Sequence, residues 1–174
     1  MQRVMIIGQP GSGKSTLAAR LGEITGLPVF YIDREVHWKP GWIERTPLEK
    51  AILCAEIHAK DEWIFEGGHS STWPDRLDRA DTLVWIDLPL SLRLWRVVRR
   101  TIVHHGRSRP EMPENCPERF NREFFEWIWV TRKTGRQIAQ KLASLAPSDK
   151  NLAHLRSRKE VAFWLAEVEQ QHEP

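Results

Sequence analysis

The chain has 174 residues, a length that suits one compact domain, and its 41% hydrophobic and 28% charged residues are typical of a globular protein. No apolar run approaches a membrane span and the N-terminus lacks a signal-peptide pattern, so we expect a cytoplasmic protein without a membrane partner. The two cysteines, Cys54 and Cys116, are too few for a disulfide framework, which agrees with a reducing compartment.

Short apolar segments alternate with amphipathic segments along the whole chain. Thr46 and Glu49 form a capping box at the start of one helix. This order predicts an α/β fold, a single domain over 1–174 with a parallel sheet covered by helices on both faces. The expected strands are residues 3–7, 27–33, 63–66, 82–87 and 151–155. The expected helices are residues 14–24, 47–60, 90–101, 118–134 and 159–170, with a loop over 104–117.

Residues 8–16 match the phosphate-binding loop pattern G-x-x-x-x-G-K-[ST], and they lie between an expected strand and an expected helix. Glycines let such a loop turn its backbone N–H groups toward phosphate, and the following helix adds its positive N-terminal end. Lys14 supplies a mobile charge for the β- and γ-phosphates, and the hydroxyl of Ser15 suits Mg²⁺. We therefore expect ATP and Mg²⁺ as cofactors, bound by Gly8, Gln9, Pro10, Gly11, Ser12, Gly13, Lys14, Ser15 and Thr16.

Three carboxylates stand at the carboxyl ends of expected strands. Ligands of parallel sheets bind beyond the carboxyl ends of the strands, so Asp33, Glu66 and Asp87 are candidates for the site. Asp33 suits an acceptor hydroxyl or a metal-bound water, or alternatively it caps a turn. Glu66 and Asp87 each fit as the carboxylate beside the metal. We favour Glu66, because its strand is expected next to the loop strand, whereas Asp87 equally suits a helix cap.

Arginines line one face of the expected helix over 90–101 and continue into the loop after it. Such a stripe is typical of a lid that grips phosphate oxygens and excludes water, and a solvated helix paired with nearby glutamates is the alternative. Arg156, after the last expected strand, is a candidate for stacking on the nucleobase. The arginines of the stripe and the loop are Arg93, Arg96, Arg100, Arg107 and Arg109.

Basic residues concentrate in the middle of the chain. Residues 93–136 carry 11 Lys and Arg against 5 Glu and no Asp, although the whole chain has a net charge of only +3. This segment indicates an anionic partner, either a nucleotide or a nucleic acid, or else a solvated helix face. The charge pattern does not specify an oligomeric state.

Several further motifs accompany the loop in one order along the chain. They are Asp33 with Trp38-Lys39-Pro40-Gly41-Trp42, Trp63-Ile64 leading to Glu66 and glycine, Arg79-Ala80-Asp81, Ile86-Asp87-Leu88-Pro89, Arg96 to Arg100, Arg109-Pro110, and Cys116-Pro117-Glu118-Arg119. Over almost the whole chain this combination resembles the adenylate-kinase-like branch of P-loop kinases, and within it the DNA topology modulation (FlaR-type) proteins.

The resemblance implies a three-layer P-loop NTPase fold like that of nucleoside and nucleotide kinases, with five parallel strands in the order 2-3-1-4-5. It also implies an acceptor-side insert at about 34–62, a helical lid at about 100–122, and ATP·Mg²⁺ in the loop. By similarity, Arg96 and Arg100 match the paired arginines that open the lid. The related pattern has Asp-Gly-Asn-Tyr where this chain has Glu66-Gly67-Gly68-His69, so an acceptor preference does not carry over.

We therefore expect a kinase that transfers the γ-phosphoryl group of ATP·Mg²⁺ to a small-molecule acceptor, with a nucleoside monophosphate as one candidate. In this hypothesis Lys14 holds phosphates, Glu66 and Ser15 lie on the metal side, and Asp33 engages the acceptor. Arg96 and Arg100 neutralise developing charge. The alternative is a nucleotide-gated DNA-binding, topology-modulating regulator with little or no turnover, although the sequence contains no recognised helix-turn-helix or zinc motif.

Overall fold

The computed structural model describes residues 1–172, and strands alternate with helices throughout them. The strands are β1 (Arg3–Gly8), β2 (Val29–Tyr31), β3 (Trp38–Lys39), β4 (Ile43–Glu44), β5 (Trp63–Glu66), β6 (Thr82–Ile86) and β7 (Asn151–Leu155). The helices are α1 (Lys14–Thr25), α2 (Pro47–His58), α3 (Trp73–Arg79), α4 (Leu90–Val103), α5 (Arg122–Val130), α6 (Thr134–Ser144) and α7 (Arg158–His172). A π-helical turn spans Asp33–His37, and a 3₁₀ turn spans Ser70–Thr72.

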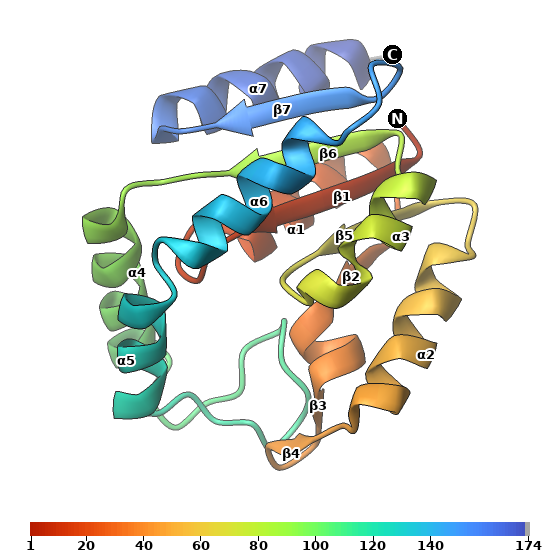
Figure 1. Ribbon diagram of the computed structural model, residues 1–174. Helices are drawn as coiled ribbons and strands as arrows, with labels where there is room; N and C mark the ends of the chain where they lie inside the picture. The colour runs from red at the N-terminus through yellow and green to blue at the C-terminus, as the bar shows by residue number, and fades with distance from the viewer. Residues whose placement is uncertain (173–174) are drawn as a thin grey trace.

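Five strands form one parallel sheet in the order β2-β5-β1-β6-β7 (Figure 1). Numbered along the chain without the small hairpin of β3 and β4, this order is 2-3-1-4-5, which confirms the expected fold class. β1 pairs with β5 on one side and with β6 on the other. The segment that follows Gly8 therefore leaves the sheet between the carboxyl ends of β5 and β6, where ligands of such sheets bind.

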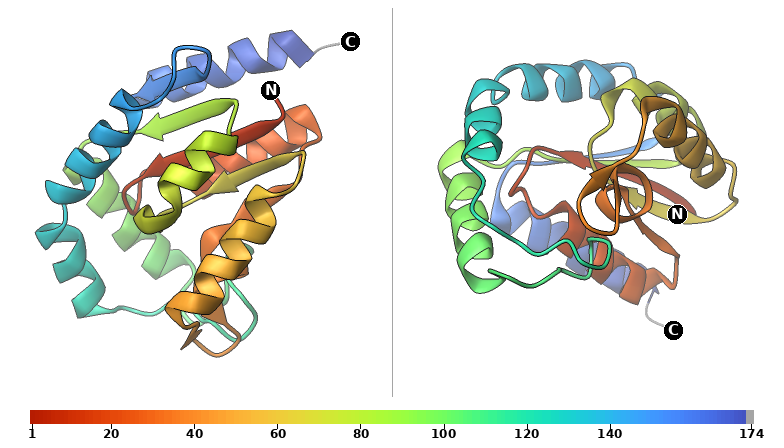
Figure 2. Two further views of the ribbon diagram at one scale, coloured as in Figure 1. Left: turned by 45° about the vertical axis from the view of Figure 1, so that its right-hand side comes forward. Right: turned by 90° about the horizontal axis from the view of Figure 1, so that it is seen from below.

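Helices cover both faces of the sheet, because side chains of the buried strands point alternately to either side. In β1, Val4 and Ile6 belong to the core that α1 and α7 cover. Met5 and Ile7 belong to the core that α2, α3 and α6 cover. Figure 2 shows these two groups of helices on opposite sides of the sheet. Within residues 1–172, every helix is too short or too polar to cross a membrane.

The predicted helix over 118–134 is present but shorter at both ends, as α5 over Arg122–Val130. Asn121 caps the start of α5 by accepting a hydrogen bond from the backbone N–H of Phe124 at 3.1 Å. The side chain of Gln9 donates to the carbonyl oxygens of Thr131 and Arg132, both at 3.1 Å, at the point where α5 ends. The chain then starts a second helix, α6, which we did not predict, and neither did we predict α3.

Other predicted elements agree more closely with the structure. The strands over 63–66 and 151–155 have the expected bounds, and the capping box of Thr46 and Glu49 is formed. The predicted strand over 27–33 is shortened to β2, because its partner β5 ends at Glu66 and the chain then turns into the π-helical turn.

Residues 104–121 form an irregular segment, called here the strap, that runs from α4 to the β3–β4 hairpin and back to α5 (Figure 1). The backbone N–H of Trp42 donates to Sγ of Cys116 at 3.3 Å, and its indole N–H donates to the carbonyl oxygen of Pro117 at 3.2 Å. The N–H of Gly41 donates to the carbonyl oxygen of Glu114 at 3.3 Å. The strap thus connects helices on one side of the molecule to the hairpin on the other.

Candidate active site

The loop over 8–16 requires glycine at fixed positions. The φ angles of Gly8 and Gly11 are +154° and +76°, which residues with a side chain rarely adopt. A Cβ atom would lie 2.6 Å from the carbonyl oxygen of Ile86 at Gly8, and 2.4 Å from that of Arg93 at Gly11. The loop is therefore pressed against the end of β6 and the first turn of α4.

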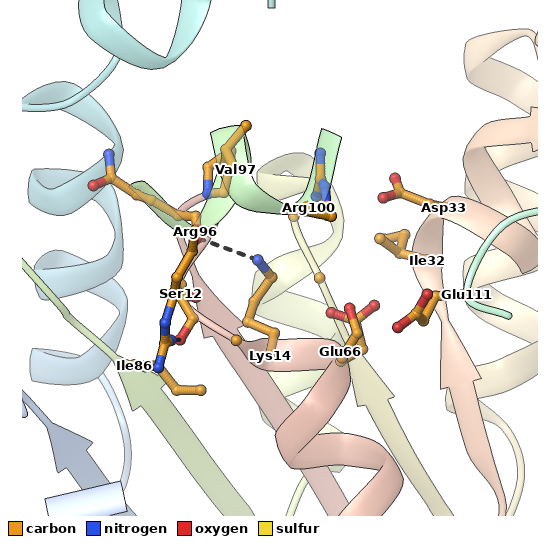
Figure 3. A pocket seen from close by; sticks show the side chains of 18 of the residues that line it. Ser12, Lys14, Ile32, Asp33, Glu66, Ile86, Arg96, Val97, Arg100 and Glu111 are labelled. Carbon is orange, nitrogen blue, oxygen red and sulfur yellow. Dashed lines mark hydrogen bonds between the residues drawn. The ribbon is translucent and has the colours of Figure 1, made fainter. Parts of the chain in front are cut away.

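Lys14 is the first residue of α1, and its side chain extends back over the loop (Figure 3). Its ammonium group donates to the carbonyl oxygen of Gln9 at 3.4 Å. Burial lowers the pKa of Lys14, and the carboxylates of Glu66 and Asp33 oppose this shift. Within the described part of the chain, the buried hydroxyl of Ser12 has no hydrogen-bond partner. The loop thus combines the ammonium group of Lys14 with a buried hydroxyl, that of Ser12, which is available to a ligand.

Glu66 ends β5 beside β1, and only 3% of it is exposed. Burial raises the pKa of Glu66 to about 7, an effect that Lys14 opposes and Asp33 reinforces. A divalent cation would favour the ionised carboxylate. Glu66 therefore has the position and the surroundings of a metal-side carboxylate.

Asp87, the alternative to Glu66, lies outside the lining of the cavity described below. Its carboxylate accepts a hydrogen bond from Nε of Arg136 at 2.9 Å and lies 3.3 Å from Nε2 of His154. The interpretation of Asp87 as a helix cap is wrong, since α4 begins after Pro89 with no side chain as its cap. Asp87 instead ties α6 and β7 to the end of β6.

Arg96 and Arg100 reach toward the loop from α4, as expected from their spacing. Nη1 of Arg96 donates to the carbonyl oxygen of Ser12 at 2.9 Å. Nη2 of Arg100 donates to Oε1 of Glu118 at 3.3 Å, and its guanidinium lies 5.9 Å from the ring centroid of Phe124. Both arginines line the cavity.

Arg93 belongs to the same stripe but has a different environment. It is 3% exposed, and it donates to the carbonyl oxygens of Leu88 at 3.1 Å and Pro10 at 3.3 Å. Arg93 therefore braces the loop against α4. Arg107 is exposed and does not line the cavity, whereas Arg109 does.

Arg158, and not Arg156, lines the cavity at its β7 end. Ser157 caps α7 by accepting from the backbone N–H of Glu160 at 3.1 Å, and Glu160 accepts from the backbone N–H of Arg156 at 2.8 Å. Arg158 is thereby the first residue of α7, whereas Arg156 is exposed outside the cavity. The Ser-x-x-Glu capping box at 157–160 is the sequence signal that locates this first turn.

A cavity of about 1640 Å³ opens in front of the loop. Most small-molecule sites have volumes of ~300–1,000 Å³, so this cavity has room for two substrates. One side, called here the loop half, is lined by Glu66 and by members of 8–20, 86–104, 118–139 and 158–165. The other side, the insert half, is lined by members of 32–44, 67–73 and 109–112.

The insert half brings Asp33 toward Glu66 from the start of the π-helical turn. In Figure 3, the carboxylates of Asp33, Glu66 and Glu111 surround one space beside Lys14. Glu111 comes from the strap, and sequence reasoning did not select it, because no local pattern relates it to a turn 78 residues earlier. Within this half, the rings of Trp38 and Trp42 pack edge to face with their centroids 5.2 Å apart.

Known proteins resemble the chain in sequence and in fold. No family model matches it. The cytidylate kinase of Aeropyrum pernix is 32% identical over 123 residues, which cover 63% of this chain and 71% of that protein. The chain belongs to the same family of P-loop kinases. The shikimate kinase of Halorhodospira halophila is 26% identical over 130 residues, covering 67% of this chain and 70% of that one.

A solved shikimate kinase from Acinetobacter baumannii has the same fold as this P-loop kinase. Its TM-score is 0.59 at 14% identity, over 98% of this chain and 92% of that one. The chain is therefore a phosphotransferase of the nucleotide-kinase-like P-loop group. The comparisons do not show its expected membership of the DNA topology modulation (FlaR-type) proteins.

Proposed function

We propose that this P-loop kinase transfers the γ-phosphoryl group of ATP·Mg²⁺ to a small acceptor bound in the insert half. The observation that carries this proposal is a single cavity onto which the phosphate loop, Glu66 and the arginines of α4 all open. Phosphoryl transfer depends on positioning two substrates and neutralising charge, and the volume and the lining side chains suit both tasks.

The loop half fits the nucleotide and the metal. Glycines with no space for a Cβ, an unpaired Ser12 hydroxyl and a buried carboxylate at Glu66 are what a phosphate chain with Mg²⁺ would engage. The loop N–H groups and Lys14 would hold phosphates, and Ser15 and Glu66 would be the metal-side oxygens. When bound, the metal neutralises phosphate charge. Arg158 takes the place beside the nucleobase that we expected for Arg156.

Three side chains would act on the transfer itself. Asp33 is the first residue of the π-helical turn, and its carboxylate lines the insert half. It would therefore accept the proton of an acceptor hydroxyl bound there. Arg96 and Arg100 would neutralise charge on the transferred group. Arg100 would exchange Glu118 for phosphoryl oxygens, a change that suits a lid over about 100–122 closing toward an insert over about 34–62.

The relatives suggest two kinds of acceptor. The similarity to cytidylate kinases supports a nucleoside monophosphate, and the similarity to shikimate kinases supports a hydroxyl compound that is not a nucleotide. We also propose that the chain is related to the FlaR-type proteins, and the sequence motifs of the strap and the hairpin support this.

The replacement Lys14→Ala tests the proposed function. We expect ADP release, measured across a panel of hydroxyl compounds and nucleoside monophosphates, to fall by about 10²- to 10³-fold, as when one charge-stabilising group is removed. Lys159→Ala, at an exposed position on α7, is the matched control and should keep wild-type turnover. Circular dichroism and the melting temperature check that both variants fold. Full turnover by the folded Lys14→Ala protein would contradict the mechanism.

A nucleotide-gated DNA-binding regulator is the second candidate, and the basic segment over 93–136 is the observation that favours it. Four of its eleven basic residues are engaged inside the molecule, since Arg93 and Arg96 bind loop carbonyls and Arg100 and Arg109 bind Glu118. Six others are exposed, namely Arg99, Arg107, Arg119, Arg122, Lys133 and Arg136. A salt titration of DNA binding separates the candidates. Affinity that rises steeply at low salt and changes with ATP supports the regulator, and absence of binding at low salt removes it.

A further inference from the structure

The charges of the cavity are divided between its two halves. Within residues 1–172, all the Lys and Arg side chains that line the cavity but one lie in the loop half. They come from the loop, α1, α4, α7 and the residue after Glu118, and they are Lys14, Arg20, Arg96, Arg99, Arg100, Arg119 and Arg158. This half suits the polyphosphate of a nucleotide.

The one cation that lines the insert half is Arg109, and its charge is already engaged. Nε of Arg109 donates to Oε2 of Glu118 at 2.9 Å, and Nη1 lies 3.5 Å from Oε2 of Glu111. The side chains of Arg109 and Glu118 are only 12% and 9% exposed. Once Arg100 has exchanged Glu118 for phosphoryl oxygens as proposed above, Arg109 is the remaining cation on Glu118. An acceptor phosphate that took Arg109 as well would leave this buried carboxylate without a cation, at a substantial cost.

Apart from Lys60, which is exposed outside the cavity, the other Lys and Arg side chains in and beside the insert are also engaged, and in the described structure none of them lines the cavity. Each is bound to a carboxylate or a carbonyl group, or is fully buried. They are Arg34 on Glu35, Lys39 on Glu49, Lys50 on Glu44, Arg45 on the carbonyl group of Trp38, and Arg76, which stacks on Phe65 behind the cavity. The insert half therefore offers no free positive charge to a second phosphate group within residues 1–172.

The remaining lining of the insert half is acidic or uncharged. Asp33, Glu44 and Glu111 contribute carboxylates. The rings of His37 and His69 lie 5.5 Å apart, and burial lowers the pKa of both, which favours their uncharged forms. The indoles of Trp38 and Trp42 add an apolar wall.

We infer that the acceptor is a small hydroxyl compound without phosphate or carboxylate groups, either uncharged or positively charged, such as a sugar, a polyol, a nucleoside or an amino alcohol. A second phosphate group would face three carboxylates with no free counter-charge, whereas a hydroxyl group finds Asp33 as its partner. The apolar face of a sugar ring suits the two indoles. This inference rests on the proposed kinase function and specifies its acceptor.

A binding experiment tests the inference without knowledge of the natural acceptor. The wild-type protein is saturated with AMP-PNP·Mg²⁺ and titrated by calorimetry with CMP and with inorganic phosphate. We expect neither to bind at millimolar concentration. A protein that binds the analogue and also binds CMP would overturn the acceptor class alone. A protein that does not bind the analogue would refute the proposed function, and the inference with it.

Turnover is then compared within matched pairs, cytidine with CMP and glucose with glucose 6-phosphate, and shikimate is added as a carboxylate. We expect kcat/KM to be higher for the member without phosphate in each pair. A higher kcat/KM for a phosphorylated member, or shikimate as the best acceptor, would overturn the inference.

The variant Glu111→Gln removes one carboxylate of the insert half and one partner of Arg109. We expect it to reduce the discrimination against CMP or inorganic phosphate by about tenfold, the size of one charge interaction at partial burial. Glu114→Gln, at an exposed strap position outside the cavity lining, is the matched control and should keep wild-type discrimination. Equal behaviour of the two folded variants would contradict the role of the acidic lining.

Discussion

Arg76 is the most unusual single residue, because it is fully buried and within residues 1–172 it forms no ion pair. Its guanidinium lies 3.7 Å from the ring centroid of Phe65, and Nη1 donates to the carbonyl oxygen of Gly67 at 3.1 Å. Its Nε donates to Nε2 of His58 at 3.3 Å. Arg76 therefore fixes the turn directly after Glu66, and it can do so only while His58 is uncharged.

The pH dependence of unfolding measures this contact. Burial, and secondarily Arg76, lowers the pKa of His58 to about 4 from 6.5. The unfolded chain takes up the proton first as pH falls, so stability is lost between pH 6.5 and pH 4. We expect this residue to contribute a loss of about 2–3 kcal/mol. Urea unfolding measures the free energy of unfolding at pH 7 and at pH 4.5. The difference between these two values should be smaller for His58→Gln than for the wild type, because glutamine keeps a hydrogen-bond acceptor that does not titrate.

His105→Gln, at an exposed strap position, is the control and should retain the wild-type difference between the two pH values. An unchanged difference in His58→Gln would show that another group dominates. At this scale the sequence predicted Lys14, Ser15, Glu66 and Asp33, because each stands next to a strand end or in a known motif. It did not predict Arg76, which no local motif marks, or Glu111, which lines the same cavity as Asp33 from 78 residues further along the chain.

At the scale of elements, the break between α5 and α6 depends on a residue of the phosphate loop. Gln9 donates to the carbonyl oxygens of Thr131 and Arg132, and a Cβ atom on Gly135 would lie 2.6 Å from Nε2 of Gln9. The local sequence pattern does not mark this junction, which explains why the predicted helix over 118–134 extended beyond Val130. The Thr46 capping box, in contrast, is complete within four residues and was predicted correctly.

Replacing Gln9 by Ala should loosen this junction while α2 stays unchanged. Loss of two hydrogen bonds lowers the local opening free energy by about 1–2 kcal/mol, which is roughly a 5- to 30-fold increase in amide exchange. Hydrogen–deuterium exchange of the amides over 131–137 measures this. Gln137→Ala, exposed on α6, is the control and should exchange as wild type does. Equal protection of the junction in both variants would show that packing alone maintains the break.

At the scale of the molecule, the strap joins the two halves of the cavity. The alternation of strands and helices was enough to predict the class of fold, and the resemblance supplied the order of its strands. Neither supplied the contact of Trp42 with Cys116, which lies 74 residues along the chain and has no periodic signal. The φ angle of Trp42 is +62°, an uncommon conformation that this contact helps to maintain. The hairpin and the strap therefore form one unit.

Replacing Cys116 by Ala tests whether they act as one unit. The change removes the acceptor of the Trp42 N–H and leaves a small cavity, so we expect a loss of about 1–2 kcal/mol in stability. Because the hairpin and the strap support each other, trypsin should cleave faster both in 38–45 and in 104–121. Cys54→Ala, another buried cysteine but on α2, should lower stability without increasing cleavage in these two segments. Faster cleavage of the strap alone, with the hairpin still protected, would show that the two segments open independently and that closure over the acceptor does not require them to move together.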